Sequence, residues 1–167
     1  MAVLEAVRWA ASSNNVQLWA FLVVQKKDAV AHDAMLACLM DRNKSWPALA
    51  PVLILTFVEP IWTEQDRDNA TAVHDVRVAS AMMPIQAEAL DLRTHHMAGI
   101  HHDVIRAAYV VSEEFNAVSA IAMGHQGTLD LLTEDKNRAR ESNPWTRKSL
   151  DEIVLAGTFG TPAKLAL

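Results

Sequence analysis

The residue types best suited to chemistry gather in one short segment near the start of the sequence. There, hydroxyl and amide side chains crowd a turn between an apolar helix and an apolar strand. Side chains of this kind bond readily to nearby backbone groups, so one interpretation is an ordinary helix-ending turn. The other interpretation is a binding site. The polar residues are Ser12, Ser13, Asn14, Asn15 and Gln17.

A basic pair lies far downstream, at Arg147 and Lys148. A planar guanidinium and an ammonium group together suit a phosphate, although a charge pair in a polar stretch is commonly just solvated. The sequence has no G-x-S-x-G elbow, P-loop, G-x-G-x-x-G fingerprint or H-E-x-x-H helix. Reactions that depend on these motifs are therefore disfavoured.

Seven histidines, with doublets at His95-His96 and His101-His102, raise the question of a metal site. Adjacent residues on a strand point to opposite faces, and no carboxylate or cysteine stands at ligand spacing. We therefore predict no metal site. Cys38 is the only cysteine, which excludes an intrachain disulfide and fits a reducing compartment.

Composition and charge narrow the class of protein. The 167 residues are 51% hydrophobic and 21% charged, which is typical of one globular domain, 1–167. The net charge of -5 lacks the basic footprint of a nucleic-acid partner and disfavours anionic membranes. No apolar run approaches the roughly 20 residues that span a bilayer, and no secretion signal is visible. We expect a cytoplasmic protein.

Hydrophobic periodicity predicts helices that alternate with strands, which indicates an α/β or α+β sandwich. The segment 51–58 is continuously apolar and is expected to be a central strand covered on both faces. Further strands are expected at 21–24, 94–98 and 117–123. Helices are expected at the N-terminus, at 28–41 with Asp28 as its cap, from Val73 to Leu90, and at 103–108.

Two helices carry predicted buried faces. Pro84 is expected to kink the longer one or to separate two shorter helices. The segment 124–143 is polar and irregular, whereas 143–167 is expected to leave its domain as a C-terminal arm that packs on a partner subunit. The expected faces are Val30, Ala34 and Cys38 in the shorter helix, and Val73, Val76, Ser80, Met83, Ala87 and Leu90 in the longer.

The order of these segments resembles the FMN-dependent nitroreductase family from Leu4 to Gly160. That family typically shows an E-A-x-x-W-A-P-S-S-x-N-x-Q-P-W-x-F block. This sequence carries Glu5-Ala6, Trp9-Ala10, Ser12-Ser13, Asn15, Gln17, Trp19 and Phe21 in register. Weaker matches follow at Asn43-Lys44-Ser45-Trp46, Ala50-Pro51-Val52-Leu53, His74-Asp75-Val76, His96-Met97-Ala98-Gly99, Ala120-Ile121-Ala122-Met123-Gly124 and Thr146-Arg147-Lys148.

The resemblance implies an α+β nitroreductase-like fold, with a central mixed β-sheet flanked by helices, in an intertwined homodimer. It implies FMN at the dimer interface, with Trp62 on a loop that acts as a substrate lid. The strand-end segment would lie beside the reactive ring nitrogen, where glycine permits close approach. The implied cofactor-binding residues are Ser12, Ser13, Asn15 and Gln17 along the flavin, Asn43 at its ring edge, Met97, Ala98 and Gly99 at the strand end, and Arg147 and Lys148 at the phosphate.

The function implied by the resemblance is an FMN-dependent NAD(P)H oxidoreductase with ping-pong turnover. NADH or NADPH would reduce FMN and leave, and a nitroaromatic, quinone or similar flat acceptor would then bind. The flavin carries the chemistry, so no catalytic side chain is predicted. A non-catalytic or flavin-storing dimer is the main alternative, and a hydrolase or metal-binding protein that uses the same cleft is the lesser one.

The sequence departs from the family pattern in two ways that predict weaker FMN binding. Family members begin earlier, with an Arg-rich R-R-S-x-R segment that grips the phosphate, so the chain resembles an N-terminally abridged member. Each lost charge-assisted hydrogen bond is worth about 1.5–3 kcal/mol. In addition, Ala11 and Leu18 replace two prolines of the motif, which loosens the expected turn.

Overall fold

The computed structural model describes residues 1–62 and 65–164. The chain divides into two compact units, Met1–Thr133 and Glu134–Leu167. The expected C-terminal arm, 143–167, falls within the second unit, and its packing on a partner stays a prediction. No helix of the described residues is long and apolar enough to cross a membrane.

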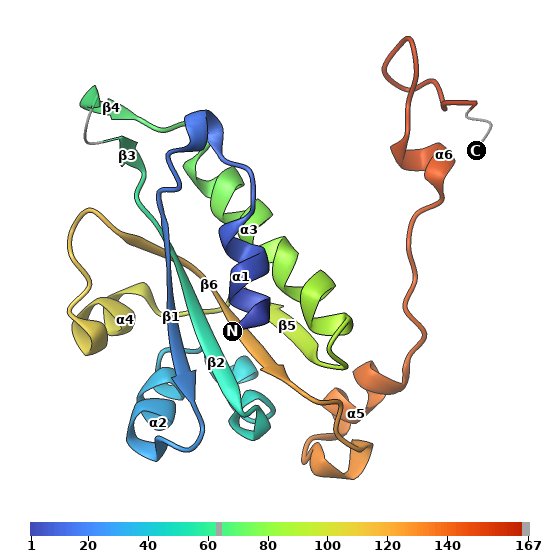
Figure 1. Ribbon diagram of the computed structural model, residues 1–167. Helices are drawn as coiled ribbons and strands as arrows, with labels where there is room; N and C mark the ends of the chain where they lie inside the picture. Colours follow the sequence, from blue (N-terminus) through green and yellow to red (C-terminus); the bar gives the residue numbers. More distant parts are fainter. Residues whose placement is uncertain (63–64, 165–167) are drawn as a thin grey trace. The chain divides into compact units, whose positions relative to one another are not determined.

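A four-stranded sheet forms the centre of the first unit (Figure 1). Its strands are β1 (Trp19–Gln25), β2 (Val52–Val58), β5 (Arg93–Met97) and β6 (Asn116–Gly124), in the order β1-β2-β6-β5. The expected strands at 21–24, 51–58, 94–98 and 117–123 are therefore confirmed, each with shifted ends.

Every pair of neighbouring strands in this sheet is antiparallel, so the expected mixed sheet is wrong for the described residues. The reason lies in the crossover from β2 to β5. Helix α3 (Ala72–Glu88) connects β2 to β5 across one face of the sheet, so β5 runs parallel to β2. The two strands are not neighbours in the sheet. The space between them is filled by β6, which runs the opposite way.

The central strand β2 is covered on both faces, as expected. Leu53, Leu55 and Phe57 pack into one hydrophobic cluster, while Ile54 and Val58 face the other side of the sheet. Alternate residues of a strand point to opposite faces, so a continuously apolar strand needs a helical layer on each side. One layer holds α2 (Ala29–Ala37) and α4 (His102–Tyr109), and the other holds α1 (Ala2–Arg8) and α3.

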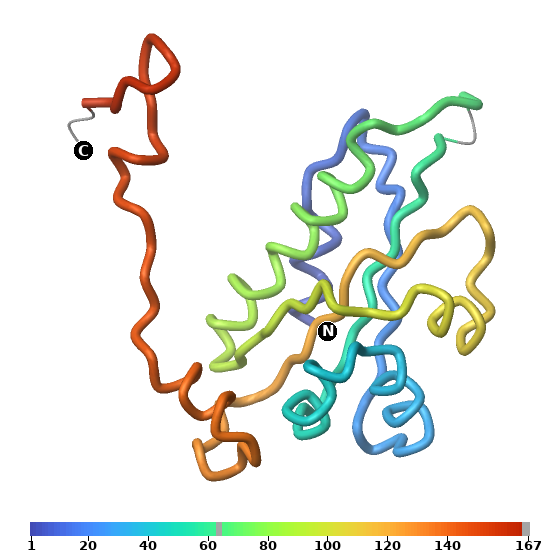
Figure 2. The backbone as a smooth tube through the Cα atoms, turned by 180° about the vertical axis from the view of Figure 1, so that it is seen from behind, coloured from blue at the N-terminus to red at the C-terminus, as the bar shows by residue number. Residues whose placement is uncertain are grey.

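Helices α1 and α3 lie side by side in both Figure 1 and Figure 2. The middle of the expected stripe on α3 is buried, but Val73 and Leu90 at its ends are 42% and 45% exposed. The long helix runs without a break through Pro84, so of the two expectations the single helix holds and the alternative of two shorter helices does not.

The expected face of α2 is only partly right. Asp28 caps the helix, since its Oδ1 accepts a hydrogen bond from the Ala31 amide at 3.1 Å. Cys38, just past the helix, is buried, but Val30 is 83% exposed and His32 is buried in its place. The His32 ring contacts the Ala50 carbonyl oxygen at 3.1 Å through Nε2, a partner that periodicity does not reveal.

The second unit contains α5 (Asp135–Ser142) and α6 (Leu150–Ile153). Helix α5 lies in the 124–143 stretch that was expected to be irregular, so that expectation is wrong there. It was missed because α5 has no buried residue and hence no apolar stripe. Helix α6 begins with a capping box formed by Ser149 and Glu152.

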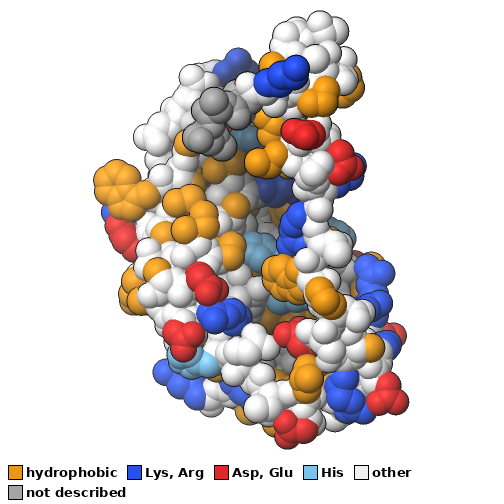
Figure 3. Space-filling view, turned by 90° about the vertical axis from the view of Figure 1, so that its right-hand side faces the viewer, with side chains coloured by type: hydrophobic (Ala, Val, Ile, Leu, Met, Phe, Trp, Pro, Cys, Tyr) orange, Lys and Arg blue, Asp and Glu red, His pale blue; other side chains and the backbone are white. Residues whose placement is uncertain are grey.

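Exposed hydrophobic side chains remain on the surface, and Figure 3 shows them on one face among charged groups of both signs. In the first unit Trp9 is 74% exposed and Ile85 on α3 is 66% exposed. In the second unit Trp145 is 82% and Phe159 is 97% exposed. Scattered apolar side chains of this kind are ordinary, whereas contiguous ones favour a partner.

Candidate functional site

The polar turn between α1 and β1 is closed by its own side chains. Asn14, Asn15 and Gln17 adopt positive φ angles of 50°, 57° and 55°, which asparagine tolerates better than most residues. Ser12 Oγ accepts the Gln17 amide hydrogen at 3.2 Å, and Gln17 Nε2 donates to the carbonyl and side-chain oxygens of Asn15, both at 3.1 Å. Four of the predicted residues are thus brought together in one segment, Ser12–Gln17.

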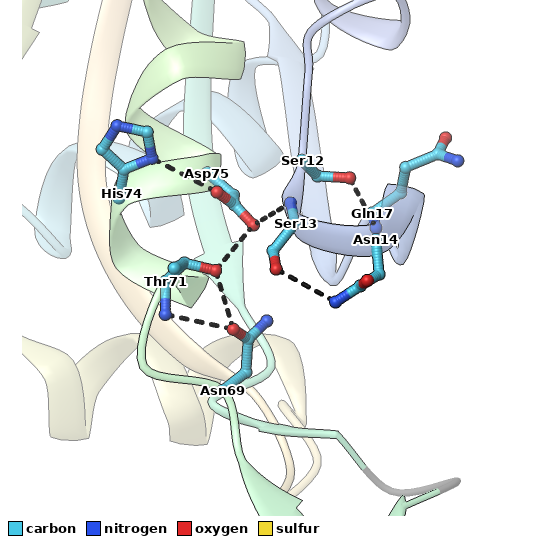
Figure 4. A network of polar contacts seen from close by, with 8 residues as sticks. All are labelled: Ser12, Ser13, Asn14, Gln17, Asn69, Thr71, His74 and Asp75. Carbon is cyan, nitrogen blue, oxygen red and sulfur yellow. Dashed lines mark hydrogen bonds and ion pairs between the residues drawn. The ribbon is translucent and has the colours of Figure 1, made fainter.

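The turn is also tied to the start of α3, as Figure 4 shows. The Asp75 carboxylate, on a residue only 5% exposed, accepts the Ser13 amide hydrogen at 2.9 Å and the Thr71 hydroxyl hydrogen at 3.2 Å. The Asn69 side-chain oxygen accepts from the Thr71 amide at 3.1 Å and lies 2.9 Å from the Thr71 hydroxyl, whose single hydrogen it shares with Asp75. Asp75 belongs to one of the weaker family matches, but no role was predicted for Asp75, Thr71 or Asn69. An acidic residue next to Val76, within the expected buried stretch of a helix, was the signal that could have indicated a role for Asp75.

The strand-end segment is the second group of predicted residues that the structure brings together. Met97 and Gly99 are buried, while Ala98 between them is exposed. Asn43 Nδ2 donates to the Gly99 carbonyl at 3.3 Å, and the Met40 amide donates to the same oxygen at 3.0 Å. A Cβ atom at Gly99 would lie 2.6 Å from Asn43 Nδ2. Glycine is therefore needed for this close approach.

Two histidines precede this segment on β5. The His95 ring packs edge-on against Trp46, with 4.4 Å between ring centroids. Desolvation lowers the pKa of His96, and the neighbouring His95 lowers it further. Both effects favour the neutral imidazole. Among the described residues no group of three or more His, Cys, Asp or Glu side chains is placed to hold a metal ion.

Trp62 lies on a short hairpin rather than on an irregular loop. Strand β3 (Ile61–Trp62) pairs antiparallel with β4 (Arg67–Asp68), and residues 63–64 lie outside the described part of the chain. The Arg67 guanidinium carbon lies 4.9 Å from the centre of the Trp62 ring, a cation–π contact. The Glu59 amide donates to the Leu18 carbonyl at 3.0 Å. The base of the hairpin is therefore attached to the end of the polar turn.

The basic pair belongs to the second unit, where both residues are exposed. Arg147 donates from Nη1 to the Thr146 carbonyl at 2.7 Å, and its guanidinium carbon lies 5.2 Å from the Trp145 ring centre. Arg147 is thus held beside its own chain neighbours. The contact of Arg147 and Lys148 with a phosphate stays a prediction.

The turn and the strand end are separate within one chain. Strand register places Leu22, Leu55, Ala120 and Met97 in one row across the sheet. Met97 therefore lies about 14 Å from Leu22, at about 4.8 Å per strand, and the turn begins about 10 Å or more along β1 beyond that row. No hydrogen bond or ion pair among the described residues joins the turn to Asn43 or Gly99.

A cavity of about 220 Å³ lies beside β1, but none of the predicted cofactor residues lines it. Its wall is apolar and aromatic, and includes Phe21, Phe57, Tyr109 and Phe115. The Tyr109 hydroxyl is buried without a hydrogen-bond partner, and desolvation raises its pKa to about 12, with a smaller contribution from Cys38. The predicted flavin residues thus lie elsewhere on the first unit and on the second unit, outside this cavity.

Solved structures resemble most of the chain. An oxidoreductase containing FMN superposes with a TM-score of 0.86 at 26% identity, over 95% of this chain and 80% of its own. A nitroreductase family protein from Clostridium difficile 630 superposes with a TM-score of 0.68 at 22% identity, over 93% of this chain and 83% of its own. The chain has the nitroreductase fold. An FMN-dependent nitroreductase from Clostridium difficile R20291 superposes with a TM-score of 0.64 at 18% identity, over 87% of this chain and 85% of its own.

The expected α+β nitroreductase-like fold, with its central sheet and flanking helices, is therefore confirmed. No protein-family profile matches the chain, and no curated protein sequence matches it. The nitroreductase fold is accordingly recognised through structure, at sequence identities between 18% and 26% for these three proteins.

The strand end of this nitroreductase-fold chain carries groups of the kind that a flavin ring can bond. Asn43 uses Nδ2 on Gly99 and leaves Oδ1 as an acceptor for a ring N–H. A Cβ at Gly99 would lie 3.4 Å from the Arg42 Nη2 atom, so a guanidinium stands beside the strand end. Exposed Ala98 next to glycine leaves the backbone open to a flat ligand. Among the predicted cofactor-binding residues, only Arg147 and Lys148 are expected to bind the FMN phosphate.

Proposed function

We propose that this protein is an FMN-dependent NAD(P)H oxidoreductase of the nitroreductase type. The observation that carries the proposal is the match at a TM-score of 0.86 to an oxidoreductase that contains FMN. The polar turn and the glycine-containing strand end would supply the polar contacts to such a cofactor. FMN, when bound, would take a hydride equivalent from NADH or NADPH and pass the electrons to an acceptor.

The residues would share the work of binding. Asn43 would bond the ring edge through Oδ1, and the exposed backbone at Ala98 would approach the ring. Arg147 and Lys148 would neutralise the phosphate charge. The remaining predicted contacts come from the turn and the flanks of the strand end, through Ser12, Ser13, Asn15, Gln17, Met97 and Gly99.

We propose that two copies of the chain share each site. The separation of the turn from the strand end, estimated at about 14 Å across the sheet and about 10 Å along it, supports this arrangement. In this arrangement the turn of one copy would meet the strand end of another at the same flavin ring. The exposed apolar side chains Ile85 and Trp9 are available for such an interface. The exposed apolar residues of the 143–167 arm would cover the partner.

We propose that the Trp62 hairpin covers the acceptor. Arg67 packs on one face of the Trp62 ring at 4.9 Å, so that the guanidinium and the indole form a flat pair on the hairpin. Such a surface suits planar acceptors, including nitroaromatics and quinones, because stacked rings attract one another. Glu59, just before the hairpin, bonds to Leu18, just after the turn, so the hairpin begins next to the segment proposed to bind the ligand.

Purification of the full chain tests the proposal. Bound FMN would make the protein yellow, and addition of NADH or NADPH without oxygen would bleach the flavin absorbance. A flat acceptor such as a benzoquinone would then restore the absorbance. Protein that remains colourless after incubation with excess FMN would contradict the proposal. Sedimentation velocity tests the homodimer independently.

A non-catalytic, flavin-storing dimer is the second candidate. The observation in its favour is that the turn side chains bond to one another, as Gln17 does to Asn15 at 3.1 Å, which leaves fewer groups for a ligand. Such a protein would bind FMN and be reduced by dithionite, yet it would not be reduced by NADH or NADPH.

A further inference from the structure

The buried carboxylate of Asp75 lies in the first turn of a helix but does not accept a hydrogen bond from the backbone of that helix. It lies at the start of α3, whose N-cap residue Thr71 makes no side-chain cap bond to the helix. Burial of a carboxylate is unfavourable unless hydrogen bonds replace its hydration. Asp75 finds its partners outside the backbone of α3, and one of them is 62 residues away in sequence.

Three groups converge on this carboxylate in Figure 4. Oδ2 accepts from the Ser13 amide at 2.9 Å and from the Thr71 hydroxyl at 3.2 Å. Oδ1 lies 3.2 Å from Nδ1 of His74, whose side chain is 74% exposed. The contact with Ser13 joins α3 to the turn, while the other two contacts stay within α3 and its cap.

The contact with Ser13 holds a turn whose backbone includes conformations that are unfavourable for residues other than glycine. Ser13 opens a short 3-10 helix, η1 (Ser13–Asn15), and the preceding Ser12 makes no side-chain cap bond to it. The next residues include three with positive φ, at Asn14, Asn15 and Gln17. Such conformations persist only where the surroundings hold them in place. The Asp75 carboxylate supplies that hold from outside the turn.

We propose that Asp75 is the positioning residue that holds the Ser12–Gln17 turn in the conformation in which it meets FMN. This inference rests on the proposed function for the identity of the ligand. Asp75 itself is buried and acts through the Ser13 backbone rather than by contact with the cofactor. A helix-stabilising role alone would leave the turn, and hence FMN binding, unchanged.

The substitution Asp75→Asn tests the proposal because it keeps the shape of the side chain and removes its charge. A charge-assisted hydrogen bond to Ser13 is weakened, so we expect the FMN dissociation constant of the full chain to rise about tenfold. We also expect the amide resonances of residues 12–17 to shift in NMR spectra of the protein without FMN. Thr71→Val, which removes one of the two Oδ2 partners, should raise the constant about threefold.

Asp103→Asn is the matched control. Asp103 is likewise an acid in the first turn of a helix, α4, but it is exposed and makes no contact with the turn. Its loss removes the favourable interaction with the helix dipole alone. Binding is measured by quenching of FMN fluorescence at a temperature at which all variants are folded. The visible circular dichroism of bound FMN reports whether the ring environment changes.

The proposal is supported if Asp75→Asn shifts the turn resonances and weakens FMN binding while Asp103→Asn does neither. It is overturned if Asp75→Asn lowers the melting temperature but leaves FMN binding and the turn resonances as in the wild type. Wild-type protein that takes up no FMN would contradict the proposed function. In that case unshifted turn resonances in Asp75→Asn would overturn the positioning role as well, and shifted ones would support it.

Discussion

The polar turn and the strand end, the two candidate regions of the first unit, are held in different ways. In the turn, side chains bond to one another and to Asp75 on α3. At the strand end, the absence of a side chain at Gly99 lets Asn43 approach within hydrogen-bond distance of the backbone. The turn therefore depends on a network with several members, whereas the strand end depends on space at one residue. The two should respond differently to substitution.

The largest effect is expected at the strand end from Gly99→Ala. Its Cβ would lie 2.6 Å from Asn43 Nδ2, so one of the two groups must move. Overpacking of this kind costs about 1–3 kcal/mol. We expect that loss in the free energy of unfolding, measured with urea. In the Asn43→Ala background the crowded amide is absent, so Gly99→Ala should lower the free energy of unfolding much less than it does in the wild type. An equal cost in both backgrounds would contradict the role of space.

A smaller effect is expected in the turn from Ser12→Ala. The variant removes the acceptor of the Gln17 amide hydrogen, whose distance is 3.2 Å, and leaves the rest of the network in place. One neutral hydrogen bond is worth about 1 kcal/mol, so the free energy of unfolding should fall by about that amount. Ser142→Ala removes an exposed hydroxyl that bonds within α5 and serves as the control. A cost for Ser12→Ala above that of Gly99→Ala would reverse the comparison.

The hairpin beside the turn should show an effect on turnover rather than on stability. Arg67→Met removes the guanidinium that lies 4.9 Å from the Trp62 ring centre. A cation–π contact at an exposed position is worth about 0.5–1 kcal/mol, so the KM for a flat acceptor should rise about threefold with kcat nearly unchanged. Arg67→Lys should retain part of the contact. A fall in kcat at constant KM would argue against a lid.

The smallest effect concerns the pH dependence of the strand end. The folded-state pKa of His96 lies below its usual value of 6.5, first because of desolvation and then because of His95. The unfolded chain therefore binds the proton more readily. The contribution of neutral His96 to stability is fully present above pH 6.5 and is lost as the pH falls through the folded-state pKa.

Melting temperatures measured from about pH 8 to about pH 5 test this expectation. The wild type should lose stability below pH 6.5, and His96→Gln should lose less over the same range. His125→Gln, at an exposed histidine outside the strands, is the control. A steeper acid loss in His96→Gln than in the wild type would contradict the direction of the shift.

Some features of the site were predictable from residue types alone. Ser12, Asn15 and Gln17 were expected to form a turn because such side chains bond to local backbone, and the side chains of Ser12 and Gln17 do so. Gly99 was expected to permit close approach of a flavin ring, which stays a prediction; in the structure the space at Gly99 is used by the Asn43 amide. Their contacts with FMN stay predictions, as do those of Arg147 and Lys148.

Other features depend on contacts between distant parts of the chain. The bond from Ser13 to Asp75 joins residues 62 apart, and nothing in the local pattern pairs them. The burial of His32 in place of Val30 depends on the Ala50 carbonyl, 18 residues away. Helix α5 was missed for the opposite reason, since it lies exposed and leaves no apolar period to detect.

The sequence by itself determined the kinds and the order of the central strands and of the helices that pack on them, because the period of apolar residues is set by local backbone geometry. It also determined which segments carry polar groups that could bind a ligand. The tertiary structure alone decided that β6 lies between β2 and β5, and hence that the turn and the strand end stand apart on one chain. The order of strands in a sheet follows from which long crossover packs on which face, and that choice is made by the whole core.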